Sequence, residues 1–145
     1  MPLQIAASGP DTDWSNIMEA IFVAITTAED YIYITTPYFI PNPEIVKALQ
    51  LAVRSDIKVK IIVPQISDSW IAQYATNSFI ELLLEAGVEI YHYTKGFIHA
   101  KTMVVDGVFS SVGTANIDYR SFNINFEVNA LMYNTDFGSQ LVEMF

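Results

Sequence analysis

Apolar runs that alternate with helical segments constrain the fold of this chain more than any other feature of the sequence. Strand-like runs are expected at residues 31–36, 57–63 and 88–93. Helical segments are expected at residues 13–28, 43–54 and 69–86, with Asp13 as N-cap of the first and Gly87 directly after the last. Two neighbouring strands that are joined through a helix usually lie parallel. This order therefore predicts a parallel sheet covered by helices.

The pattern changes after residue 93. Strand-like stretches at Phe97–Val105 and Val108–Val112 flank the pair Asp106-Gly107, which is a strong signal for a two-residue hairpin. A further alternating strand is expected at Phe126–Tyr133, and the chain closes with helical character at Gly138–Phe145. We expect an α/β fold in which a mixed, largely parallel sheet is sandwiched between helices, with residues 1–145 in one domain.

Composition and charge narrow the classes of function. Hydrophobic residues make up 52% and charged residues 16% of the chain, which excludes a disordered protein. Without cysteine or a His-x3-His pair, neither disulfides nor a metal site are expected. The net charge of −9 counts against a basic patch for a nucleic-acid backbone, so nucleic acid is not an expected partner. No apolar stretch approaches the ~18–20 residues that span a bilayer, so the piece is expected to be soluble.

His99 and Lys101 are the first candidate site residues. Side chains alternate faces along a strand, so both are expected on the same face of the predicted strand Phe97–Val105. An imidazole beside an ammonium is unfavourable unless an anion lies near both, and phosphate is the obvious candidate. Taken alone, His99 would be interpreted as an ordinary strand histidine and Lys101 as a lysine at the rim of the sheet.

Gly113, Thr114 and Asn116 follow the predicted hairpin. Thr114 and Asn116 offer a hydroxyl and a carboxamide on one face, and Gly113 allows another backbone to approach closely. Rigidly placed hydrogen-bond donors suit a phosphoryl transition state, since catalysis there is mostly positioning and charge stabilisation. The alternative is that Asn116 only caps a helix.

Together these residues complete the pattern H-x-K-x4-D-x6-G-(S/T)-x-N, in which the chain resembles the phospholipase D superfamily. The resemblance implies phosphodiester chemistry through a covalent phosphohistidine, without a cofactor. It implies that His99 is either the nucleophile or the acid that protonates the leaving oxygen. Lys101 and Asn116 would hold the non-bridging oxygens, with Thr114 contributing less.

Two acidic residues accompany these groups. Asp106 belongs to the motif, but strand parity places it opposite His99 at the start of the turn, which favours a structural role over direct chemistry. Glu127 lies in an otherwise apolar strand, and a buried carboxylate needs a partner. Superfamily members resemble this chain in carrying an acid at about this place. We assign Glu127 as the group that orients His99, as in triad logic, with a salt bridge to Arg120 as the alternative.

Four longer stretches look like the second half of bacterial cardiolipin synthases: residues 34–41, 96–101, 115–121 and 125–129. This resemblance runs over nearly the whole chain. It implies transphosphatidylation, in which a phosphatidyl group passes from one phosphatidylglycerol to the glycerol hydroxyl of another, with release of glycerol. It also implies a longer parent protein at the bacterial cell membrane, of which this chain is a C-terminal fragment. Tyr38 and Arg120 either line the substrate pocket or serve as packing and surface residues.

The active site of this family needs two copies of the motif, and this chain has one. The second copy is expected in the same parent chain or in a homodimer mate related by a two-fold axis. Two alternatives remain open. One is a single-motif superfamily nuclease that acts as a homodimer, which the charge of −9 opposes. The other is an isolated half that folds but is inactive.

Overall fold

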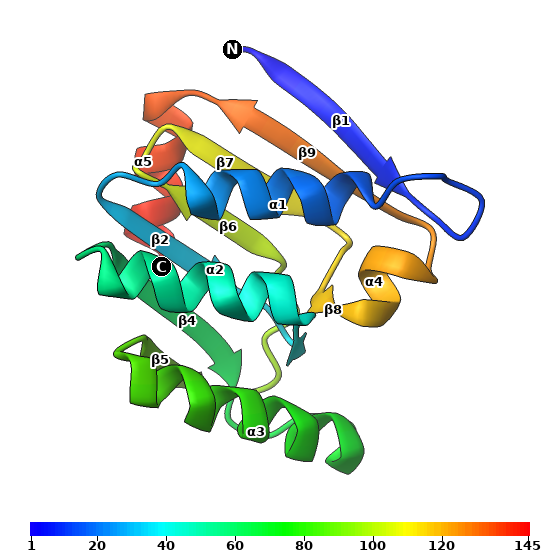
Figure 1. Ribbon diagram of the computed structural model, residues 1–145, viewed down its shortest axis with the longest axis vertical. Helices are drawn as coiled ribbons and strands as arrows, with labels where there is room; N and C mark the ends of the chain where they lie inside the picture. The colour runs from blue at the N-terminus through cyan, green and yellow to red at the C-terminus, as the bar shows by residue number, and fades with distance from the viewer.

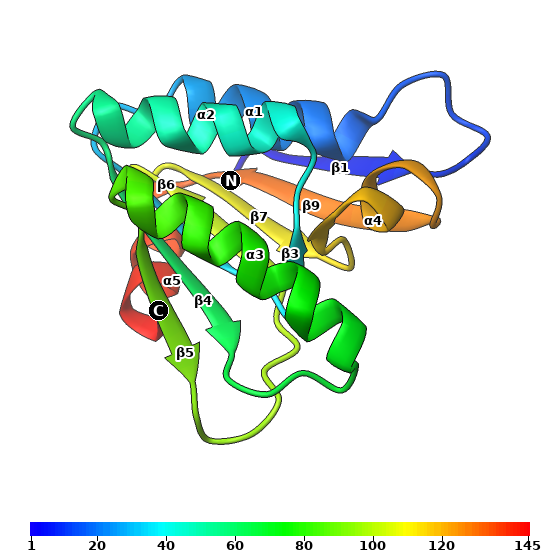
Figure 2. The same ribbon diagram turned by 60° about the horizontal axis from the view of Figure 1, so that its bottom comes forward.

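A computed structural model describes residues 1–145 and contains one seven-stranded sheet. In their order across the sheet, the strands are β1 (Leu3–Ser8), β9 (Glu127–Tyr133), β7 (Phe109–Gly113), β6 (Thr102–Val105), β2 (Tyr31–Thr35), β4 (Lys58–Pro64) and β5 (Glu89–Tyr93). Helices α1 (Asn16–Thr26), α2 (Pro43–Arg54) and α3 (Trp70–Ala86) cover one face (Figure 1), and α5 (Thr135–Met144) lies on the other (Figure 2). The predicted α/β class, with a mixed sheet between helices, is confirmed.

The prediction that the sheet is largely parallel is wrong. Only the pairs β2–β4 and β4–β5 are parallel, and the other four neighbouring pairs are antiparallel. The parallel part consists of the three strands that helices connect, as predicted. The hairpin β6–β7 and the strands β9 and β1 extend the sheet by reversals, and β1 was not predicted at all.

The boundaries of α2 and α3 follow from local signals. Pro43 occupies the first turn of α2 after Asn42 at the N-cap, where its missing N–H costs no hydrogen bond. The Ser69 hydroxyl accepts a hydrogen bond from the Ala72 N–H at the start of α3. Gly87 ends α3 in the left-handed conformation, with φ of 104°. Both helices therefore lie where the sequence predicts them.

The start of α1 differs from the prediction because its first turn is satisfied from a distant strand. Ser15, rather than Asp13, is the N-cap, and its side chain makes no capping hydrogen bond. Instead the Ser8 hydroxyl at the end of β1 accepts from the Ile17 N–H at 3.1 Å, in a buried position. A capping contact across nine residues leaves no local signature, so the sequence suggested the nearer aspartate.

The main core lies between the sheet and helices α1–α3, where 25 buried hydrophobic residues form one cluster. Ile32 and Ile34 of β2 and Ile61 of β4 are at most 1% exposed there. Branched side chains suit a pleated and buried surface, which explains why these segments form strands. None of the helices combines the length and the apolar character required to cross a bilayer.

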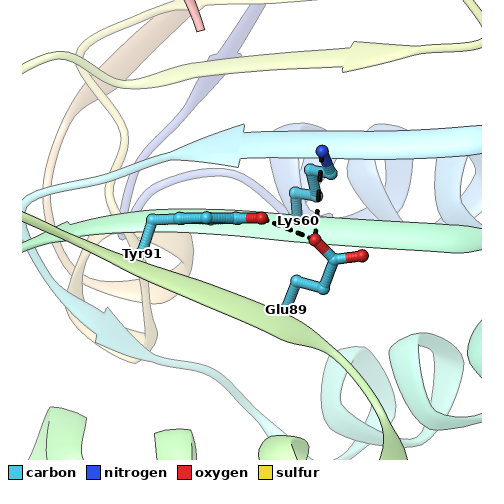
Figure 3. A network of polar contacts seen from close by, with 3 residues as sticks. All are labelled: Lys60, Glu89 and Tyr91. Carbon is cyan, nitrogen blue, oxygen red and sulfur yellow. Dashed lines mark hydrogen bonds and ion pairs between the residues drawn. The ribbon is translucent and has the colours of Figure 1, made fainter.

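The opposite face of β4 and β5 carries a small polar network (Figure 3). The Tyr91 hydroxyl donates to Glu89 Oε2 at 2.6 Å, and Lys60 Nζ lies 3.9 Å from the same oxygen. The Lys60 ammonium also lies 5.4 Å from the centre of the Tyr33 ring. The hydrogen bond to Glu89 raises the pKa of Tyr91. Exposed ion pairs contribute little stability, so the network adds little to the backbone pairing that joins β5 to β4.

Gly138 lets α5 pack directly on the turn between β6 and β7. A Cβ atom at this residue would lie 2.1 Å from the carbonyl oxygen of Gly107. We expect Gly138→Ala to lower the free energy of unfolding by about 1–3 kcal/mol, because α5 or the turn must move apart. Urea denaturation measures this, with the exposed neighbour Ser139→Ala as control. A loss within about 0.5 kcal/mol of that control would contradict the packing.

Candidate active site

The predicted hairpin of β6 and β7 forms. Strands β6 and β7 pair antiparallel, and Val105 is the partner of Phe109. The turn therefore contains three residues rather than two. Asp106 and Gly107 have φ values of 54° and 66°, the conformations that Asp-Gly sequences favour in hairpins.

The predicted strand over Phe97–Val105 is wrong in its first half. Strand β6 begins at Thr102, and residues 97–101 are irregular. The cause is topological, because β4 and β2 lie between β5 and β6 in the sheet. The connection must cross three strand spacings, roughly 14 Å at ~4.8 Å each. Residues 94–101 make this crossing, so the argument that His99 and Lys101 share a strand face does not apply.

His99 and Lys101 nevertheless meet at one cavity. The cavity has a volume of about 420 Å³, and its lining includes His99, Lys101, Gly113 and Thr114. Lys101 Nζ donates to the His99 carbonyl oxygen at 2.7 Å, which holds the crossing segment in shape. The His99 ring is exposed and makes no hydrogen bond within the chain. Its imidazole nitrogens are therefore free to act on a bound group.

Burial lowers the pKa of Lys101, while the carboxylates of Glu127 and Asp118 act in the opposite direction. Removing an ammonium from water disfavours its charged form, so the lowered pKa means that the acids do not fully compensate for this loss. An anion bound in the cavity would supply the missing negative charge. The electrostatics of Lys101 therefore suit an anionic ligand.

The segment from Gly113 to Asn116 is fixed against β9. A Cβ atom at residue 113 would lie 2.3 Å from the Val128 carbonyl oxygen and from Asn129 Oδ1, so only glycine fits there. Asn129 is 3% exposed, accepts from the Ala115 N–H at 3.2 Å and donates to Ser111 Oγ at 2.9 Å. The close backbone approach that the sequence predicts at Gly113 is confirmed, and the Gly113 N–H donates to the Lys101 carbonyl oxygen at 3.3 Å.

Asn116 presents a side-chain amide without internal partners. Its Oδ1 is buried and has no hydrogen-bond partner, and its Nδ2 forms no hydrogen bond within the chain. The backbone N–H of Asn116 donates to Ser121 Oγ at 3.0 Å, which keeps the residue in place. Buried polar groups are rarely left unpaired, so this amide is a candidate for contact with a ligand.

Thr114 is already engaged with β9. Its hydroxyl accepts from the Val128 N–H at 3.0 Å and lies 3.4 Å from the Val128 carbonyl oxygen as a donor. The hydroxyl therefore joins the segment after β7 to the backbone of β9. This engagement is in keeping with the smaller contribution that the sequence assigns to Thr114.

A second, two-stranded sheet joins distant parts of the chain beside this segment. Strands β3 (Phe39–Ile40) and β8 (Ile117–Asp118) pair parallel, and α4 (Tyr119–Asn123) follows β8 directly. The Thr36 hydroxyl accepts from the Ile117 N–H at 3.3 Å and donates to the Tyr38 carbonyl oxygen at 2.8 Å. Thr36, Ser121 and Asn129 carry no sequence signal as positioning residues, because the groups that they bind lie outside their own elements.

Tyr38 reaches the site through an aromatic row. Its ring centre lies 6.1 Å from that of Phe97, whose centre lies 5.4 Å from the His99 ring. The Tyr38 hydroxyl donates to Asp68 Oδ1. Burial, followed by the hydrogen bond to Asp68, raises the pKa of Tyr38 to about 12, so the phenol stays protonated at neutral pH. Tyr38 thus borders the site at the side of Phe97.

The predicted contact between Glu127 and His99 is absent. Glu127 Oε1 accepts from Asn125 Nδ2 at 3.4 Å and forms no hydrogen bond or ion pair with His99. Glu127 begins β9, whereas His99 precedes β6, and β7 lies between these two strands. Arg120 is exposed and does not pair with Glu127 either. Glu127 acts instead on the charge of Lys101.

Asp106 lies away from the cavity and ties the hairpin turn to the start of β2. Its carboxylate accepts from the backbone N–H groups of Glu29, Asp30 and Tyr31 at 2.8, 2.9 and 2.9 Å. These contacts are structural.

No group of His, Asp and Glu side chains is arranged to hold a metal ion.

Solved structures of low sequence identity share this fold. Nuc, a phospholipase D family member from Salmonella typhimurium, is 22% identical, with a TM-score of 0.82 over 99% of the chain and 90% of that protein. A phosphatidylserine synthase from Haemophilus influenzae is 17% identical, with a TM-score of 0.72 over 98% of the chain and 37% of that protein. The fold is therefore a phospholipase D-like fold.

Sequence comparison defines the family more narrowly. The family profile described as "Cardiolipin synthase, PLD-like domain" matches residues 21–145. The cardiolipin synthase of Geobacillus thermodenitrificans is 48% identical over 143 residues, which are 99% of this chain and 28% of that protein. The major cardiolipin synthase ClsA of Bacillus subtilis is also 48% identical over 143 residues, which are 99% of this chain and 30% of that protein. The chain belongs to the PLD-like domain family of cardiolipin synthases, and it spans less than a third of the length of these relatives.

The contacts of Asp106 predict a loss of stability when its carboxylate is changed. Asp106→Asn keeps the size and tolerates a positive φ, but its NH2 group cannot accept a hydrogen bond. We expect the free energy of unfolding to fall by about 1–2 kcal/mol in urea denaturation, because at least one charge-assisted hydrogen bond is lost. Asp13→Asn is the control, since the Asp13 carboxylate makes no hydrogen bond. Unchanged stability would argue against the structural role.

Proposed function

We propose that this chain supplies one of the two half-sites of a phosphatidyltransferase that makes cardiolipin from two phosphatidylglycerol molecules. The observation that carries the proposal is the cavity lined by both His99 and Lys101, together with Gly113 and Thr114 of the segment that leads to Asn116. The 48% identity to cardiolipin synthases supports the choice of substrate. The parent protein would then act in phospholipid biosynthesis at the bacterial cell membrane.

The proposed reaction needs two histidines that divide two tasks. One imidazole attacks the phosphorus of phosphatidylglycerol, so a P–N bond forms and the P–O bond to the headgroup glycerol breaks. The other imidazole gives its proton to the departing glycerol oxygen. It then takes a proton from the hydroxyl of a second phosphatidylglycerol, which attacks the phosphohistidine, forms cardiolipin and frees the first histidine. His99 is one of these two histidines, in either role.

Lys101 and Asn116 would stabilise the charge on the non-bridging phosphate oxygens. Burial disfavours the charged form of Lys101, and the carboxylates of Glu127 and Asp118 offset this effect only in part. The negative charge of an incoming phosphate would offset the remainder. The Asn116 amide adds a neutral donor that needs no rearrangement, because Ser121 and the β3–β8 pair hold its backbone. Thr114 contributes little directly, since its hydroxyl is engaged with Val128.

The site is half complete in this chain. His99 has neither a second histidine nor a carboxylate as hydrogen-bond partner here. A second half-site, from elsewhere in the parent chain or from a homodimer mate, would face it across a two-fold axis. Tyr38 is assigned to the pocket margin through its row with Phe97, whereas Arg120 is exposed on α4 and does not line the His99 cavity.

The assignment of His99 predicts that its removal abolishes the reaction. Parent protein incubated with phosphatidylglycerol is expected to release cardiolipin and glycerol in equal amounts, and His99→Ala should lower the rate by at least about 1,000-fold. Lipid chromatography and a glycerol assay measure both products. His92→Ala is the matched control, because His92 is an exposed histidine on β5 outside the cavity, and it should retain the wild-type rate.

Two outcomes would contradict the proposal. Product formation by His99→Ala at near the wild-type rate would remove His99 from the chemistry. Parent protein that leaves phosphatidylglycerol intact but cleaves DNA would favour the nuclease alternative, which the net charge of −9 disfavours.

A further inference from the structure

Four exposed apolar side chains cluster where α3 begins. Trp70 is 80% exposed, Tyr74 77%, Ile66 75% and Ile71 62%. Trp70 and Tyr74 lie four residues apart and therefore on one helix face, with Ile71 beside them and Ile66 in the loop before the helix. We call these four residues the α3 tip. Soluble proteins seldom expose a contiguous apolar patch without a binding role.

The α3 tip lies at the same edge of the sheet as the candidate active site. In Figure 2 the start of α3 extends past the end of β4, on the side where the connection from β5 to β6 also runs. A cavity of about 370 Å³ joins the two regions, and its lining includes Ile66, Asp68 and Phe97. The Phe97 ring centre is 5.4 Å from that of His99. A surface that contacts the tip would therefore border the site.

Charge is confined to the C-terminal half of α3, where the acids lie beside the exposed Leu82 and Leu84. The tip is followed by the exposed but uncharged Asn77 and Ser78, and then by the exposed acids Glu81 and Glu85. Protein interfaces usually have an apolar centre enclosed by a polar rim. A helix with aromatic side chains at an uncharged end and its acids at the other end can instead contact a lipid layer with that first end alone.

The charges near the tip permit contact with an anionic surface, although the whole chain carries −9. Asp68 is the only charged residue between Gln65 and Ile80, and its carboxylate accepts the Tyr38 hydroxyl. Lys95 and Lys101 lie in the neighbouring connection, which contains no acid. Glu81 lies about 16 Å along the helix from Trp70, roughly twice the Debye length at physiological salt.

We propose that the α3 tip inserts into the headgroup region of a phospholipid bilayer and thereby sets the His99 cavity against the lipid. Trp and Tyr combine a large apolar ring with a polar group, and for this reason they favour the boundary between lipid and water. The proposal rests on the proposed function, since a phosphatidyltransferase must take its substrates from such a surface. It adds the part of this chain that touches the surface.

Tryptophan fluorescence of the 145-residue chain tests the insertion. The chain has two tryptophans, so Trp14→Phe leaves Trp70 as the only one. Vesicles of phosphatidylcholine with one fifth phosphatidylglycerol, in physiological salt, should shift Trp70 emission to the blue, and brominated lipid should quench it. Trp70→Ser combined with Tyr74→Ser should lower the bound fraction in vesicle flotation about tenfold.

The matched control removes two exposed apolar side chains from the far end of the same helix. Leu82→Ser combined with Leu84→Ser should bind vesicles like the wild-type chain. Circular dichroism checks that each variant is folded. Unchanged Trp70 emission with vesicles overturns the proposal. So does normal vesicle binding by the tip variant, or a tip variant that loses only self-association, which would indicate a protein interface.

The insertion and the proposed function fail in different ways. Cardiolipin synthesis by the parent protein without a vesicle-induced shift at Trp70 overturns the insertion alone. A shift at Trp70 with no cardiolipin synthesis by the parent protein overturns the proposed function alone.

Discussion

The buried carboxamide of Asn129 holds the segment from Gly113 to Asn116 against β9, and the position of the candidate site depends on this contact. From β9, the Asn129 side chain accepts a hydrogen bond from the Ala115 N–H, in the turn after β7, and donates one to the Ser111 hydroxyl in β7. Gly113 must lack a side chain for this contact to form. With the turn after β7 fixed, Ile117 pairs with Phe39, and Gly113 and Thr114 line the cavity of His99 and Lys101. A rigid scaffold of this kind allows hydrogen-bond donors to act without rearrangement.

Local signals in the sequence were sufficient for much of the fold. Pro43, Ser69 and Gly87 mark helix ends through their own backbone preferences, and α2 and α3 lie where these residues predict. The Asp-Gly turn likewise marks the hairpin. Contacts between distant residues left no such signal. Ser8 replaces Asp13 at the start of α1, and β1 pairs with β9 from the opposite end of the chain.

In the candidate site, too, local features could be predicted from the sequence and contacts between distant residues could not. Residue identity and spacing predict His99, Lys101 and Asn116 as site residues, and the structure brings His99 and Lys101 to one cavity. Their geometry was not predictable from strand alternation, since the chain between β5 and β6 must cross β4 and β2. The predicted contact of Glu127 with His99 is absent, and its carboxylate instead partly offsets the effect of burial on the pKa of Lys101.

The central claim is that this chain contributes half of a site, and the concentration dependence of its specific activity tests that claim most directly. The 145-residue chain, assayed with phosphatidylglycerol vesicles, should make no cardiolipin while it is monomeric. Any activity should appear only as dimers form, so that the rate per protein rises with concentration. A monomeric chain whose specific activity is constant over all concentrations would contradict the account, because one His99 would then suffice.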